Sequence, residues 1–162
     1  MASDDTNSRI DSLIPHRAPM SLIDEVVSFD RAEGSLVAAF AARREWCENW
    51  AAIEYMAQTA AALAGAADIA DGHVGPPRPG FLLGTRRMDL ALDRFEPGRR
   101  YTAKAKRVFA DDETASFECE VLDGDAVVAM ATLNAFRPPD AEGFLRAQRG
   151  AGAKSDSGGG IA

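Results

Sequence analysis

The spacing of hydrophobic and polar residues changes along this chain and divides its first half into strands and one long helix. Residues 20–29 and 35–41 are rich in apolar and β-branched side chains, which predicts two strands. From residue 53 onward, apolar residues recur every three or four positions, which predicts a helix that fades near residues 71–72. Asn49 lies just before this run and is expected to be the N-cap of the helix.

The second half of the chain has the alternating pattern of half-buried strands. Four strands are predicted there: 81–92, 100–109, 114–122 and 126–136. Asp123 and Gly124 between the last two strands are typical of a tight hairpin turn. Two strands, a long helix and a four-strand meander predict an α+β hotdog fold, in which one central helix is wrapped by a curved antiparallel sheet of about six strands.

Composition sets the expected limits of the domain. Residues 1–12 are predicted to be a flexible lead, 13–138 the hotdog domain, and 139–162 a C-terminal tail that becomes disordered at its Gly/Ser-rich end. A chain of 162 residues is long enough to bury one proper core.

Charge and composition exclude several classes of protein. A net charge of -7 argues against general nucleic-acid binding. No apolar run reaches the roughly 20 residues that span a bilayer, and the start is acidic, unlike a secretory signal, so a cytoplasmic protein is expected. Cys47 and Cys119 lack metal-ligand spacing and are expected to be free thiols. With no ligand cluster and no glycine-rich nucleotide loop, the sequence predicts no metal and no redox cofactor.

Two motifs resemble those of the 3-hydroxyacyl-(acyl carrier protein) dehydratases. Residues 14–24, Ile-Pro-His-Arg-Ala-Pro-Met-Ser-Leu-Ile-Asp, resemble the family's Leu-Pro-His-Arg-x-Pro-x-Leu-x-x-Asp segment. Residues 53–58, Ile-Glu-Tyr-Met-Ala-Gln, resemble its Ile-Glu-Ala-Met-Ala-Gln helix. Residues 81–87 are most similar to one branch, the dehydratase-like hotdog "P" subunit encoded with aryl polyene pigment synthesis.

The resemblance implies a dimer with active sites at the subunit interface. In the dehydratases, a histidine from one protomer and the helix carboxylate from the other act on a 3-hydroxyacyl chain carried by acyl carrier protein, in polyene or fatty-acid-like synthesis. Two groups are needed because one takes the proton beside the carbonyl and the other protonates the leaving oxygen. Glu54 matches the catalytic carboxylate. A plain alternative is a solvated first-turn acid, which the helix dipole favours.

The chain departs from the family pattern at the histidine. Residues 40–48, where the family has Gly-His-Phe-Pro-Gly, contain no histidine, and the chain's two histidines are His16 and His73. His73 lies in a Pro/Gly loop and is expected to face solvent. A histidine-bearing partner could complete the site in a heterodimer, or His16 or Cys47 could substitute in a homodimer. The chain could also be a catalytically silent subunit that stabilises its partner, or an acyl thioesterase that uses Glu54 without a histidine.

Four further residues are expected along the substrate tunnel or to orient its contents: His16, Gln58, Phe81 and Gly84. Gln58 falls one helical turn after Glu54 and shares its face, so it can orient the carboxylate or pack at the dimer contact. A glycine at position 84 would let a substrate approach the strand backbone.

Basic residues gather between Arg78 and Arg107 in this otherwise acidic chain. Arg86 and Arg87 are the candidate contacts to the carrier protein or to its phosphopantetheine phosphate, since guanidinium groups suit phosphate geometry. A solvated strand face accounts for the same pattern.

Overall fold

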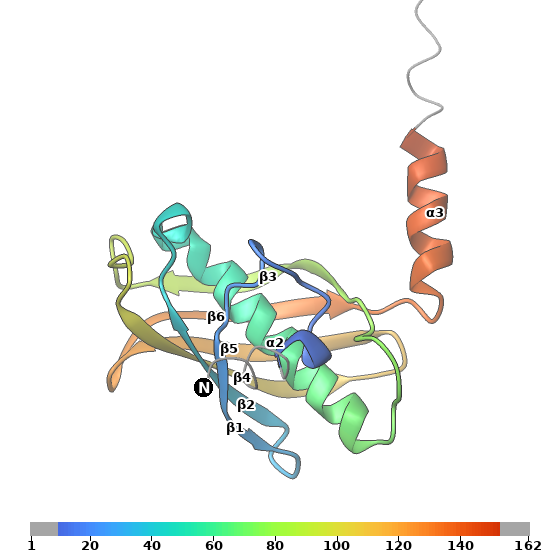
Figure 1. The fold of residues 1–162 in the computed structure, drawn as a ribbon, viewed down its shortest axis with the longest axis horizontal. Coiled ribbons are helices and arrows are strands. Elements are labelled where there is room, and N and C mark those ends of the chain that lie inside the picture. The colour runs from blue at the N-terminus through green and yellow to red at the C-terminus, as the bar shows by residue number, and fades with distance from the viewer. Residues whose placement is uncertain (1–9, 153–162) are drawn as a thin grey trace, which may run out of the picture.

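A six-stranded antiparallel sheet curves around one long helix in the computed structural model, which describes residues 10–152 (Figure 1). The strands are β1 (Glu25–Asp30), β2 (Ser35–Ala41), β3 (Phe81–Leu90), β4 (Arg100–Ala110), β5 (Thr114–Asp123) and β6 (Ala126–Phe136). The helices are α2 (Ala52–Ala70) and α3 (Ala141–Gly152), with 3-10 turns at Arg44–Trp46 and Asn49–Ala51. The strand order β1-β2-β4-β5-β6-β3 places β1 and β3 at the two edges of the sheet.

The helix α2 is rich in alanine, which favours the helical state and lets the sheet approach closely. Its larger side chains enter the core, where the Tyr55 ring stacks on Phe40 with 3.9 Å between ring centroids. Phe95 meets the edge of the same ring pair, with its centroid 5.3 Å from that of Tyr55. The helix packs mainly on β4, with β2 and β5 beside it, and leaves the edge strand β3 largely uncovered.

Several element limits differ from the prediction. The first strand begins at Glu25 rather than at residue 20, because the preceding segment is tied to α2: the Leu22 amide donates to Gln58 Oε1 at 2.8 Å. Asn49 is not the N-cap, since it lies in a 3-10 turn and Ala51 precedes α2 without a side-chain cap hydrogen bond. The predicted end of the helix is confirmed, with Asp71 as its C-cap.

The N-terminal boundary of the packed region also differs from the prediction. Ile10 lies in a short helical turn and is 1% exposed, so packing has begun by residue 10 rather than at residue 13. Residues 1–9 of the predicted lead lie outside the described residues.

The C-terminal helix α3 projects away from the sheet (Figure 1). Its Phe144 ring contacts Phe81 and Phe136 with centroid distances of 5.1 and 5.7 Å. The end of the predicted disordered tail, residues 153–162, lies outside the described residues. Within residues 10–152, no helix is long and apolar enough to cross a membrane.

Both cysteines are buried free thiols. Burial raises the pKa of the Cys119 thiol to about 12. At pH 8 only about one thiol in ten thousand would then be ionised, and the thiolate is the reactive form. We therefore expect Cys119 to resist a chromogenic disulfide reagent in the native protein and to react after denaturation. Rapid labelling of native Cys119, located by peptide mass spectrometry, would contradict this environment.

Candidate active site

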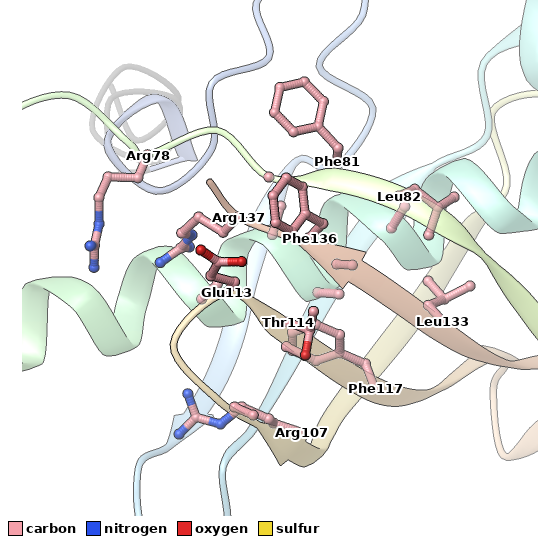
Figure 2. A pocket seen from close by; sticks show the side chains of 18 of the residues that line it. Arg78, Phe81, Leu82, Arg107, Glu113, Thr114, Phe117, Leu133, Phe136 and Arg137 are labelled. Atoms are coloured by element: carbon pink, nitrogen blue, oxygen red, sulfur yellow. The ribbon is translucent and has the colours of Figure 1, made fainter. Parts of the chain in front are cut away.

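A cavity of about 380 Å³ opens between α2 and the end of the sheet formed by β3, β5 and β6. One wall is a stripe of α2 whose residues recur every three or four positions and so share a face. This stripe consists of Glu54, Ala57, Ala61, Ala64 and Asp68. The opposite wall is apolar and includes Phe81, Leu82, Phe117, Leu133 and Phe136 (Figure 2).

Glu54 lies at the N-terminal end of this stripe with its side chain 27% exposed. Its Oε1 accepts a hydrogen bond from Gln58 Nε2 at 2.8 Å. Gln58 is completely buried, and its other bonds fix it in place: Nε2 also donates to the Met20 carbonyl at 2.7 Å, and Oε1 accepts from the Leu22 amide at 2.8 Å. Gln58 therefore joins the Glu54 carboxylate to the segment that follows the Pro-His-Arg motif.

His16 lies beside this carboxylate in the cavity wall. Its Nε2 is 3.7 Å from Glu54 Oε1, and its buried Nδ1 has no hydrogen-bond partner among residues 10–152. An imidazole and a carboxylate at this separation can both reach one substrate. His73 is half-buried in the loop after α2, with Nε2 3.1 Å from the Pro76 carbonyl oxygen. Among residues 10–152, no group of three His, Cys, Asp or Glu side chains is arranged to hold a metal ion.

The turn around residues 43–47, before α2, is held by a hydrogen-bond network. The Tyr55 hydroxyl donates to the Trp46 carbonyl at 3.0 Å and accepts from the Arg43 amide at 3.2 Å. Burial raises the pKa of Tyr55, which keeps this hydroxyl protonated. The Arg43 guanidinium pairs with Asp24, and Cys47 Sγ donates to the Arg43 carbonyl at 2.8 Å. These bonds give the turn a structural role.

The structure brings Phe81 into the cavity wall but not Gly84, Arg86 or Arg87. Arg86 instead lines a second groove, with Ser116 and Asn134. These two residues alternate along β5 and β6 with Phe117 and Leu133 of the cavity wall, which places them on the other face of the sheet. Arg87 is exposed and pairs with Asp89, with 2.7 Å between Nε and Oδ2. Gly84 lies at a bulge of β3 with φ +155°, and an added Cβ there would meet no atom within 4 Å.

The far end of the cavity is charged, which the sequence did not reveal. Asp68 is 12% exposed and accepts two hydrogen bonds from Arg137 Nη1, at 2.9 and 3.1 Å. It also accepts from Arg78 Nε at 3.2 Å. Arg107 and Glu113 line the same end (Figure 2). Arg137 lies 69 residues from Asp68 in the chain, so only folding brings them together.

A curved sheet wraps one central helix, and an acidic residue lies in the first turn of that helix. This arrangement defines the protein as a hotdog domain, as the sequence predicted. The family model of ApeP-like proteins, described as ApeP dehydratase, matches residues 8–146. The chain therefore belongs to the ApeP-like dehydratase family, and the predicted family and branch are confirmed.

Solved structures support the same fold. The dehydratase heterocomplex ApeI:P from Xenorhabdus doucetiae shares 23% identity and a TM-score of 0.75, over 84% of this chain and 95% of that chain. A putative thioesterase from Ralstonia eutropha shares 14% identity and a TM-score of 0.53, over 68% and 82% of the two chains. The phenylacetic acid degradation protein PaaI from Thermus thermophilus shares 22% identity and a TM-score of 0.51, over 70% and 92%. No curated protein matches the sequence significantly.

Proposed function

We propose that this chain is the carboxylate-bearing subunit of a two-chain dehydratase that acts on 3-hydroxyacyl chains carried by acyl carrier protein. The observation that carries this proposal is Glu54, held by buried Gln58 at one end of a cavity with apolar walls. Residues 40–48 supply no histidine, so the second acid-base group comes from a histidine-bearing hotdog partner. Membership of the ApeP-like dehydratase family supports this proposal, as does the similarity to a protein described as a dehydratase heterocomplex.

The chemistry divides between the two groups. A neutral imidazole is basic enough near neutral pH to accept the proton from carbon 2 of the acyl chain. Glu54, acting in its carboxylic acid form, donates its proton to the hydroxyl that leaves carbon 3 and becomes a carboxylate, so that water departs and an enoyl thioester remains. Because Gln58 bonds to Oε1 of Glu54, Oε2 is left to face the substrate. The phosphopantetheine arm of the carrier belongs to the substrate, and the proposed steps use no metal or redox cofactor.

The edge strand β3 offers the partner a place to pair. An edge strand presents unpaired backbone N–H and C=O groups, which a strand of a second subunit can satisfy. Three leucines of β3 are exposed, Leu82 by 43%, Leu83 by 64% and Leu90 by 36%. A partner that continues the sheet at β3 would cover these side chains and close the uncovered side of the cavity.

A second candidate is a pair formed within one chain by Glu54 and His16. Two observations favour this candidate: the buried Nδ1 of His16 has no partner within the part of the chain that the structure describes, and its Nε2 lies 3.7 Å from Glu54 Oε1. In that case a homodimer would dehydrate the substrate without another protein.

Enoyl product formation separates these candidates. The chain, a histidine-bearing hotdog partner and their mixture are each given a 3-hydroxyacyl carrier substrate. We expect the mixture to be much more active than either protein separately. Activity of this chain without the partner would instead support the Glu54–His16 pair, provided that His16→Asn abolishes it. Release of free carrier thiol without an enoyl product would show a thioesterase.

Gln58→Met tests the positioning of Glu54. We expect kcat of the two-chain enzyme to fall about tenfold with little change in KM, because Gln58 holds the carboxylate without touching substrate. The Leu22 amide and the Met20 carbonyl lose their partner, so the free energy of unfolding should also fall by about 1–3 kcal/mol. Gln148→Met, on the exposed side of α3, is the matched control and should change neither. If Gln58→Met is less stable but its kcat is unchanged, the role of Gln58 is purely structural.

A further inference from the structure

The helix α3 turns one face away from the rest of the chain. Its Phe144 ring lies against Phe81 and Phe136, and beyond this contact the helix projects from the sheet (Figure 1). Four exposed residues of α3 recur every three or four positions and share one face, the α3 face. They are Glu142, Leu145, Arg146 and Arg149. The α3 face is therefore acidic at its start, apolar in its middle and basic toward its end.

The charged residues of the α3 face have no partner within residues 10–152. None of the three makes an ion pair or a side-chain hydrogen bond there, and Leu145 beside them is 37% exposed. A helix of 12 residues is only marginally stable in water without tertiary contacts, and the glycines at positions 143, 150 and 152 weaken this one further. A surface that covers the α3 face would therefore stabilise the helix.

The second groove, on the outer face of the sheet, has a volume of about 340 Å³. It is lined by residues of β3, β6, β5 and β4, near the end of the sheet from which α3 departs. Val108 and Phe109 of β4 line it and are 49% and 55% exposed. Neighbouring residues of a regular strand point to opposite faces, but the register of β4 shifts between Arg107 and Phe109, so both side chains reach the groove. Exposed apolar groups gathered in this way mark a contact surface.

Charged residues flank the groove on two sides. Arg86 lines it on β3, at the edge of the sheet. Asp112 lies in the turn that joins β4 to β5, three residues after Phe109. Both side chains are exposed, and in the part of the chain that the structure describes neither makes an ion pair or a side-chain hydrogen bond. The groove thus offers a basic group on one side and an acidic group on the other.

These charges complement those of the α3 face. The groove crosses four strands, which is about 14 Å for three strand spacings. Glu142 and Arg149 lie seven positions apart, about 10 Å along the helix axis, and their side chains extend beyond it. A helix laid across the groove therefore brings Glu142 to Arg86 and Arg149 to Asp112. Leu145, between them, then covers the exposed apolar residues of β4.

We propose that this groove binds α3 of a second copy of this chain, in a symmetric pair in which each copy receives the helix of the other. The chain's own α3 is fixed at its base on the cavity side of the sheet, since Phe144 contacts Phe81 and Phe136 and both of these line the cavity. The groove lies on the other face, so the helix that fills it comes from another molecule. Both complementary surfaces belong to one sequence, which favours a second copy over a different protein.

This contact goes beyond the proposed function and does not depend on it. It uses side chains on the outer face of the sheet and leaves the backbone groups of the β3 edge to a dehydratase partner. Two such two-chain units would then associate through their α3 helices.

Analytical ultracentrifugation of the full chain over a range of concentrations tests this contact. We expect reversible association, and we expect Arg149→Glu to raise its dissociation constant about tenfold, because a symmetric contact contains the substitution twice. Addition of Asp112→Arg to Arg149→Glu should restore the affinity, since the ion pair is then reversed rather than lost. Arg44→Glu is the matched control. It makes the same change of charge at an exposed position in the 3-10 turn before α2 and should leave the dissociation constant unchanged.

A chain that stays monomeric at every concentration would overturn the proposal. Equal dissociation constants for the unmodified chain and Arg149→Glu would overturn it too, because pairing through the β3 edge alone behaves in that way. A double variant that associates as weakly as Arg149→Glu would also contradict it. Phe109→Ser probes the groove itself, and an unchanged dissociation constant there would show that α3 does not bind in it. Dehydration is assayed separately with the partner present, so that failure of the proposed activity is distinguished from failure of this contact.

Discussion

Replacement of Glu54 by glutamine in the two-chain enzyme is expected to lower kcat by about a thousandfold. The amide cannot donate an acidic proton to the leaving hydroxyl, and the proposed site contains no other carboxylate in that position. The new side chain keeps the shape of the old one, and its oxygen can still accept the hydrogen bond from Gln58 Nε2. The fold should therefore survive, which a thermal unfolding midpoint close to that of the unmodified protein would show.

Glu45→Gln is the matched control for this substitution. Glu45 is exposed in the 3-10 turn before the helix and does not line the cavity. We expect its activity to match that of the unmodified enzyme. If Glu54→Gln is equally active, this chain is a catalytically silent subunit that shapes the cavity and supports its partner.

The second large effect is on stability, at Gly65. This buried glycine of α2 faces the segment before the Pro-His-Arg motif, and an added Cβ would lie 2.1 Å from the Leu13 carbonyl oxygen. Backbone atoms cannot rotate away, so Gly65→Ala is expected to lower the free energy of unfolding by about 3 kcal/mol, despite the better helix propensity of alanine. Denaturant unfolding measures this loss.

Gly150→Ala provides the control within the other helix. An added Cβ at Gly150 meets nothing within 4 Å, so this substitution should be neutral or stabilising by about 0.5–1 kcal/mol. An unchanged stability of Gly65→Ala would mean that Leu13 does not pack against α2. In that case Pro15 and His16, which follow Leu13 and line the cavity, would not be held as described.

Features with a local period could be predicted from the sequence. The stripe that starts at Glu54 follows from helical spacing, and Gln58 was expected on the same face one turn later. The strands of the meander follow from alternation, and the order of elements leads to the hotdog fold. The predicted N-cap of the helix was wrong, because the chain enters α2 through a 3-10 turn at Asn49 rather than through a capped first turn.

The face of each residue on β3 could not be predicted, because this strand is not regular. Its register against β6 shifts between Leu82 and Gly84 and again between Thr85 and Arg87. A shift by one residue turns the following side chains to the other face of the sheet. For this reason Arg86 lies outside the cavity, and its role in carrier binding remains a prediction.

Contacts between segments that are distant in the chain could not be predicted from the sequence either. Arg137 follows the last strand and meets Asp68 from the end of α2, with no local pattern that links them. His16 and Glu54 were both singled out by their motifs, but their separation of 3.7 Å depends on how the N-terminal segment lies against the helix. The position of Gln58 between these two elements explains that separation.

The central claim is tested most directly by measuring which of the two subunits supplies the active carboxylate. In the proposed two-chain enzyme, the histidine of the partner faces Glu54, whereas the partner's own helix glutamate faces a segment of this chain that has no histidine. Dehydration is therefore measured after the partner's helix glutamate has been changed to glutamine, with unmodified Glu54 in this chain. We predict nearly full activity from this combination. Loss of activity there, together with full activity of the complex that carries Glu54→Gln, would contradict the account.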